Sequence, residues 1–134
     1  MDETRMKELG AELMRLMETG VAAAGLFAPD VLLDFTPPQW RLQARGAGQV
    51  VESRRRLHPQ PGTVPRYRID ATAHGFVIEW EERWQQDGQT MYCREMARAD
   101  VVDGAITELS VYCTGDWDEQ TQARHARDVR LLRP

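Results

Sequence analysis

Two glutamates, Glu82 and Glu95, lie in a stretch rich in large apolar side chains and are the residues best suited to do chemistry. Side chains alternate along a strand, and this alternation predicts that both glutamates share one sheet face with Trp80 and Cys93. Desolvation disfavours a charged carboxylate, so each glutamate must find a partner or keep its proton. Two interpretations follow: an acid–base pair, or structural carboxylates that pair with an arginine or lie at the wet rim.

The sheet that positions these glutamates is predicted to run from Tyr67 to Thr114. Asp87-Gly88 and Asp103-Gly104 each stand between strand-like runs, which is the strongest short-range signal for a β-hairpin. His74-Gly75 is a weaker signal of the same kind. Two-residue turns at these places predict a buried face made of Tyr67, Ile69, Ala71, Phe76, Ile78, Trp80, Glu82, Trp84, Met91, Cys93, Glu95, Ala97, Ala99, Ile106, Glu108, Ser110 and Tyr112.

The opposite face of the predicted sheet becomes apolar in one area. That area is expected to be a homodimer contact, because exposed apolar patches are seldom left uncovered and a symmetric contact covers them simply. The predicted patch consists of Met96, Leu109, Val111 and Cys113.

The two cysteines, Cys93 and Cys113, fall on opposite faces in this register, so we expect no disulfide between them. The three histidines show no metal-ligand spacing with each other or with the cysteines, and we predict no metal and no cofactor.

Helical and extended segments are expected before the sheet and one helix after it. Apolar residues at helical spacing predict a helix over 4–19, and Gly20 is a natural stop. Residues 21–28 are expected to form a short second helix, 31–36 a strand, 40–44 an extended segment and 46–57 a third helix. A polar helix is expected over 119–127, with Asp116 or Asp118 as its cap.

The composition predicts one domain over residues 1–134. Hydrophobic residues make up 42% and charged residues 28%, as in ordinary globular proteins. A net charge of −4 argues against nucleic acid or an anionic membrane as the main partner. The sequence has no apolar run of the ~20 residues that a membrane helix needs and no signal peptide pattern, so we expect a cytoplasmic protein. Its basic residues are almost all arginine, which is typical of a GC-rich bacterial genome.

Several segments resemble the nuclear transport factor 2-like superfamily, in its SnoaL-like and ketosteroid isomerase-like branch. The clearest is Leu26-Phe27-Ala28-Pro29-Asp30-Val31-Leu32-Leu33-Asp34-Phe35, which is similar to the run that opens the first strand in those proteins. Arg45-Gly46 and the segment from Gly104 to Leu109 fit the same pattern. The resemblance implies an α+β fold, in which N-terminal helices close a cone-shaped, curved antiparallel sheet around a pocket. In these relatives one acid often stands where Phe35 is found here, and a second falls near Glu95.

Two classes of function remain open. The first is a cofactor-free acid–base enzyme of the isomerase, cyclase, dehydratase or epoxide hydrolase type, acting on a small apolar or polyketide-like molecule. In it Glu95 and Glu82 would be acid and base, Tyr112 or Tyr67 would donate a hydrogen bond, and Asp34 is the next acid to consider. The second is a ligand-binding or dimeric assembly module without turnover. The residues expected to line the pocket are Tyr67, Trp80, Trp84, Met91, Cys93, Met17, Phe35 and Trp40.

Overall fold

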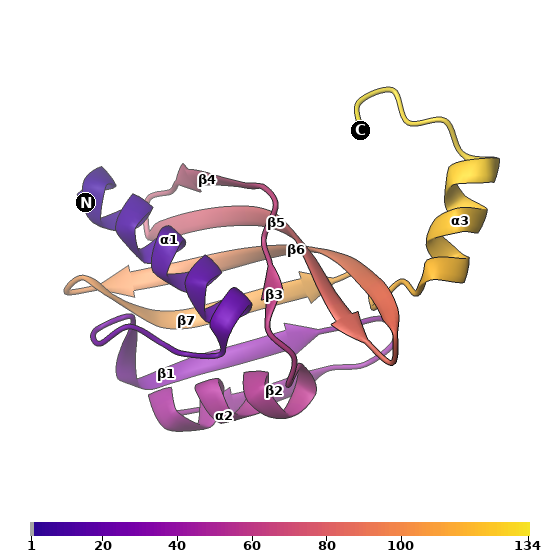
Figure 1. The fold of residues 1–134 in the computed structure, drawn as a ribbon. Helices are drawn as coiled ribbons and strands as arrows, with labels where there is room; N and C mark the ends of the chain where they lie inside the picture. Colours follow the sequence, from indigo (N-terminus) through magenta and orange to yellow (C-terminus); the bar gives the residue numbers. More distant parts are fainter. Residues whose placement is uncertain (1) are drawn as a thin grey trace.

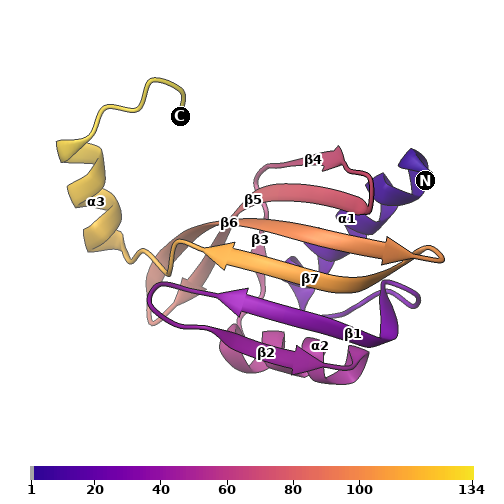
Figure 2. The same ribbon diagram turned by 180° about the vertical axis from the view of Figure 1, so that it is seen from behind.

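The computed structural model describes residues 2–134, and Figures 1 and 2 show two helices packed against one face of a curved sheet. This arrangement confirms the predicted α+β class. Over these residues the elements are α1 (Glu3–Thr19), β1 (Phe27–Thr36), β2 (Leu42–Arg45), α2 (Ala47–Leu57), β3 (Gly62–Thr63), β4 (Tyr67–Ala71), β5 (Gly75–Gln86), β6 (Gln89–Val102), β7 (Ala105–Cys113) and α3 (Glu119–Asp128).

The sheet has the strand order β2-β1-β7-β6-β5-β3, and β4 also pairs with β5. Only the contact between β1 and β7 is parallel; the other strand pairs of the described chain are antiparallel. The long hairpin strands β5 and β6 and their neighbour β7 therefore form the centre of the sheet. We call the face under α1 and α2 the concave face and the other the convex face.

Helix α1 forms where the apolar spacing predicts it. Asp2 caps its first turn by accepting a hydrogen bond from the Thr4 amide at 2.9 Å, and Gly20 ends it in the left-handed conformation with φ 75°. Gly10 lets the helix lie close to the sheet, because a Cβ atom there would come within 2.5 Å of the Ile69 side chain. Leu9 and Leu13 are fully buried against the concave face.

The hairpin between β5 and β6 has the predicted register. Asp87 and Gly88 both have positive φ, which is the conformation of the tight turns that suit the twist of a hairpin. Trp80 lies opposite Glu95 and Glu82 lies opposite Cys93, all on the concave face. The shared face of the two glutamates is therefore confirmed.

The predicted faces of β7 are wrong beyond Thr107. Asp100 pairs with Glu108, but the next residue, Val101, pairs with Ile106, so β7 carries an extra residue at this point. Such a bulge moves every following side chain to the other face. Leu109 and Val111, expected outside as part of the dimer patch, are buried in the core at 3% and 6% exposure.

The same bulge exchanges the last two residues of β7. Cys113 pairs with Glu95 on the concave face, and Tyr112 pairs with Met96 on the convex face with 63% of its surface exposed. The expected separation of Cys93 and Cys113 is therefore also wrong. The Asp103-Gly104 turn itself forms as predicted. The error comes from assuming that side chains alternate without interruption after the turn, whereas the bulge interrupts the alternation further along β7.

The short helix expected over 21–28 does not form. Leu26 is buried and its carbonyl accepts a hydrogen bond from the Ile106 amide at 2.9 Å, so this segment already follows the sheet. Strand β1 thus begins at Phe27, and Pro29 lies in the irregular part of its pairing with β7, where a missing N–H is tolerated. Two N-terminal helices, α1 and α2, close the concave face instead of three.

Helix α3 projects from the end of the sheet in both views (Figures 1 and 2) and contains no buried residue. It is attached through Trp117, whose amide donates to the Tyr92 carbonyl at 2.7 Å, and Asp118 caps it through the Thr121 amide. None of the helices in residues 2–134 has the length and apolarity needed to cross a bilayer.

Candidate functional site

A cavity of about 70 Å³ lies between the concave face and the two N-terminal helices. Its wall is apolar apart from Glu95 on β6 and Arg54 on α2. Four expected ligand-binding or catalytic residues reach it: Met17, Phe35, Trp80 and Glu95. The other lining residues are Leu13, Leu16, Phe27, Leu33, Val50, Leu57, Leu109 and Val111.

Glu82 is held beside this cavity by Arg54. The guanidinium of Arg54 forms an ion pair with the Glu82 carboxylate, and its Nη2 also donates to the Met17 carbonyl at 2.8 Å. The Trp80 indole donates to Glu82 Oε2 at 3.1 Å. Only 3% of the Glu82 side chain and 15% of the Arg54 side chain are exposed. The sequence-based alternative of a glutamate paired with an arginine is therefore correct for Glu82.

Glu95 has a different environment. Burial, then the hydrogen bond and the negative charge of Glu82, raise the pKa of Glu95 well above its ordinary value. Burial also raises the pKa of Glu82, but its hydrogen bond with Glu95 and the charge of Arg54 outweigh burial and leave that pKa lowered. The two pKa values are therefore shifted apart, which favours the ionised form of Glu82 and the protonated form of Glu95.

The two cysteines lie next to Glu95. The thiol of Cys93 donates to Glu95 Oε1 at 3.3 Å, and the two sulfurs and a Glu95 oxygen all lie within 4.8 Å of one another. Among residues 2–134 this is the only group of three such potential metal-ligand atoms. Cys93 was predicted to line the pocket; it is not among the residues that line the cavity, and its thiol contacts Glu95 instead.

His58 and Asp116 complete the polar surroundings, and neither was predicted to belong to the site. The His58 ring packs edge-on against Trp84 at 4.4 Å, and its buried Nε2 has no hydrogen-bond partner. Burial and then the charge of Arg54 lower the pKa of His58, so its imidazole is neutral. Partial burial raises the pKa of Asp116, and the negative charge of Glu82 raises it further.

The remaining predicted site residues lie outside the cavity. Asp34 stands between the lining residues Leu33 and Phe35, so it points to the other face, where Arg41 donates to it at 2.9 and 2.7 Å. Trp40 and Tyr67 are exposed by 67% and 44%, and Met91 is half-buried opposite Trp84. Tyr112, expected to donate a hydrogen bond in the site, is on the convex face because of the bulge. Neither Asp34 nor Tyr112 can reach a molecule in the cavity in this structure.

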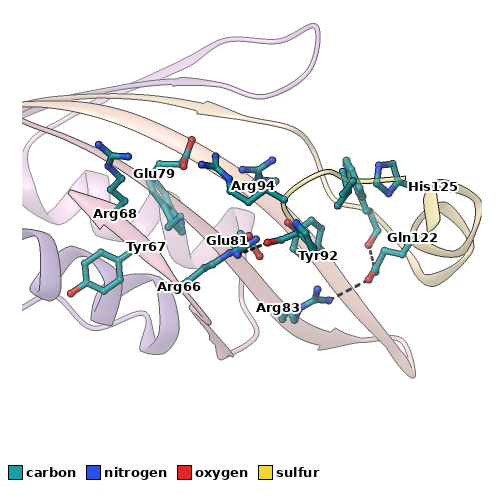
Figure 3. Close-up of a pocket in the computed structure, with 15 residues that line it drawn as sticks. Arg66, Tyr67, Arg68, Glu79, Glu81, Arg83, Tyr92, Arg94, Gln122 and His125 are labelled. Atoms are coloured by element: carbon teal, nitrogen blue, oxygen red, sulfur yellow. Dashed lines mark hydrogen bonds and ion pairs between the residues drawn. The ribbon is translucent and has the colours of Figure 1, made fainter. Parts of the chain in front are cut away.

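A second hollow, of about 540 Å³, lies on the convex side between the sheet and the C-terminal segment (Figure 3). Arg66 pairs with Glu81 at 2.6 Å, Arg83 lies over the Tyr92 ring at 4.5 Å, and Arg83 donates to Gln122 (Figure 3). It is larger than the concave cavity, but its walls are charged, and its buried carboxyl group, Glu81, is paired with the exposed Arg66. The concave cavity is therefore the better candidate for acid–base chemistry.

Comparison with known proteins supports the fold alone. The chain matches no family model and no curated protein sequence. It is similar in structure to a nuclear transport factor 2-like protein from Anabaena variabilis, with 16% identity, a TM-score of 0.68 and coverage of 84% of this chain and 90% of the other. These neighbours confirm the nuclear transport factor 2-like fold that the sequence resemblance implied.

Two further neighbours of this fold are described as enzymes. A candidate polyketide cyclase from Xanthomonas campestris is 19% identical, with a TM-score of 0.67 and coverage of 81% of this chain and 90% of its own. An LEH-like epoxide hydrolase from M. tuberculosis is 15% identical, with a TM-score of 0.64 and coverage of 82% and 83%.

Proposed function

We propose that this chain, which has the nuclear transport factor 2-like fold, is a cofactor-independent acid–base enzyme for a small apolar molecule. One observation supports the proposal above all others: Glu95, a carboxyl group that keeps its proton, forms part of the wall of an apolar cavity. A carboxyl group whose pKa is raised by burial can donate a proton at a pH where an ordinary glutamate is already ionised, as a general acid must.

In the proposed reaction, an oxygen atom of the substrate accepts the Glu95 proton. The Glu95 carboxylate formed in this way can then remove a proton from the substrate or from water. Arg54 limits the charge that builds up when both glutamates are ionised, since it already pairs with Glu82. Isomerisation, cyclisation, dehydration and epoxide opening all require one such exchange of protons. Epoxide opening is the first reaction to test, because one structural neighbour is an LEH-like epoxide hydrolase.

The size of the cavity restricts the substrate. Its 70 Å³ is well below the ~300 Å³ or more of common ligand sites, so a substrate must displace side chains or be very small. Met17 is a flexible thioether in the wall, and Leu57 is 52% exposed, so these two side chains are the ones able to move.

The test compares Glu95→Gln with Glu81→Gln on a panel of small apolar epoxides and β,γ-unsaturated ketones. Glu81 is the control, because it is also a buried glutamate of the central sheet but faces the convex side, where it pairs with Arg66. We expect Glu95→Gln to lower kcat by about 10²-fold or more, with little change for Glu81→Gln.

Equal rates for the wild type and Glu95→Gln on a substrate that is turned over would contradict the proposal. Binding of panel members, measured by calorimetry, with no turnover by the wild type would favour the alternative of a non-catalytic ligand-binding module.

We also propose that the chain forms a homodimer through the convex face and acts in the cytoplasm. Met96 and Tyr112 lie opposite each other on that face and are 46% and 63% exposed, which supports a contact there. Leu109, Val111 and Cys113 are not part of it. Light scattering should report twice the mass of one chain, and Met96→Glu should return a monomer.

A further inference from the structure

The bulge in β7 brings together two cysteines that the sequence pattern separates. Cys113 is the last residue of β7 and pairs with Glu95, and Cys93 precedes Glu95 by two residues on the same face of β6. The two sulfur atoms are within 4.8 Å of each other, and both cysteines are free thiols.

The two thiols have unequal environments. Cys93 is 2% exposed and its S–H donates to Glu95. Cys113 is only half-buried, and its sulfur accepts a hydrogen bond from the Gly115 amide at 3.3 Å. The Gly115 N–H at its sulfur and its greater exposure favour a thiolate at Cys113 rather than at Cys93.

The negative charges around the pair disfavour a thiolate on either cysteine, so the hydrogen bonds and the burial decide between the two. The neighbouring Cys93 thiol is the main cause that lowers the pKa of Cys113; burial and the negative charges of Asp116 and Glu82 oppose it. The neighbouring Cys113 and then burial raise the pKa of Cys93. Arg54 is the cation of this region and is already engaged by Glu82. The greater exposure of Cys113 and the Gly115 amide at its sulfur thus favour Cys113 over Cys93 as the nucleophile.

We propose that Cys113 and Cys93 form a redox-active dithiol that reacts with hydroperoxides and closes to a disulfide. This inference does not rest on the proposed acid–base activity, because it concerns the sulfurs alone.

The reaction has two steps. The Cys113 thiolate attacks the terminal oxygen of a hydroperoxide: an S–O bond forms, the O–O bond breaks, and the alkoxide takes up the proton that Cys113 released. Cys93 then attacks the sulfur of the sulfenic acid, the S–S bond forms, and the hydroxyl leaves as water with the proton of Cys93. The peroxide is reduced by two electrons and the two thiols are oxidised.

Closing the disulfide requires movement at the end of β7. The sulfurs must approach to about 2.05 Å, and cysteines on neighbouring strands that are not directly opposite are slightly too far apart without a backbone shift. Cys113 is followed closely by Gly115, which has φ 82°, whereas Cys93 lies inside β6 between β5 and β7. The movable side of the pair is thus the Cys113 side. Oxidation also removes the S–H that Cys93 donates to Glu95.

The experiment treats the reduced, full chain with stoichiometric hydrogen peroxide and follows it by peptide mass spectrometry. We expect the wild type to lose about 2 Da as an intramolecular Cys93–Cys113 disulfide, which dithiothreitol reverses. In Cys93→Ser, Cys113 should gain one oxygen and be trapped by dimedone. In Cys113→Ser, loss of the remaining thiol should be slower by about tenfold or more, because Cys93 is buried and protonated.

Three results would overturn the proposal: wild-type thiols that survive the peroxide, disulfides only between chains, or Cys113→Ser oxidising as fast as the wild type. Zinc that co-purifies and is released by a thiol reagent would also overturn it, because the cluster would then be a metal site. The wild-type measurement needs no variant to fold, and circular dichroism checks the two serine variants.

Discussion

Glu81 and Glu82 are neighbours on β5, both are buried and both pair with an arginine, yet they lie on opposite faces of the sheet. Glu81 pairs with Arg66, whose side chain is 61% exposed, in the convex hollow. Glu82 pairs with Arg54, whose side chain is 15% exposed and also holds the Met17 carbonyl. The convex pair is in contact with water and the concave pair is not.

A second carboxyl group makes the larger difference. Glu82 is next to the carboxyl group of Glu95. Glu95 keeps its proton because two adjacent carboxyl groups cannot both ionise at low cost. The residue directly across from Glu81 on the opposite strand is Arg94 and not a second carboxyl group. The same ion-pair chemistry therefore supports a proton-holding acid on one face and a surface pair on the other.

The largest expected effect comes from removing Arg54, and the comparison is with removing Arg66. Arg54→Met leaves the Glu82 carboxylate buried without a cation and should lower the free energy of unfolding by about 3–5 kcal/mol. Arg66→Met leaves Glu81 beside solvent, and its loss should be much smaller. Urea unfolding of the two variants measures the difference. Equal losses would show that the concave pair is as accessible to water as the convex pair.

The two faces of β7 provide the second comparison. Leu109→Ala should lower the free energy of unfolding by about 2–5 kcal/mol, because the side chain is buried in the core. Tyr112→Ala should change it by about 0.5 kcal/mol or less, since surface substitutions rarely do more. The opposite ranking, measured by thermal unfolding at a concentration that keeps the chain monomeric, would mean that β7 has no bulge.

A smaller effect should appear in the pH dependence of Glu95→Gln. The raised pKa of Glu95 means that the unfolded chain releases this proton near pH 4.5 while the folded chain retains it. Wild-type stability therefore falls as the pH rises above 4.5, and the variant does not have this loss. We expect Glu95→Gln to become more stable than the wild type as the pH increases toward 7.

The lowered pKa of Glu82 makes stability change with pH in the opposite direction in the same experiment. Its contribution to stability is present above pH 4.5 and is lost as the pH falls through its folded pKa. Urea unfolding of the wild type, Glu95→Gln and Glu82→Gln between pH 3 and 8 separates the two contributions. A stability difference between Glu95→Gln and the wild type that does not change with pH would show that Glu95 is ionised in the folded chain.

The sequence by itself determined the features that depend on nearby residues. Helix α1 follows its apolar spacing and the Gly20 stop, and the two Asp-Gly turns form the predicted hairpins. The register of β5 and β6 follows directly from the first turn, which places Glu82 and Glu95 on one face. These are local rules of backbone conformation and side-chain alternation, and they hold because the pairing between the two strands is unbroken.

Only the tertiary structure decided which groups surround the two glutamates. Arg54 comes from α2, 28 residues before Glu82 in the chain, and no local pattern selects it from the run Arg54-Arg55-Arg56. Simple alternation along β7 does not predict the extra residue either. Ile106 and Leu109 both face the core although they are three residues apart, because the bulge lies between them. That one residue sends Tyr112 to the surface and Cys113 to the site. A bulge is decided by how the whole strand packs against its neighbours, and the sequence of β7 alone does not contain that information.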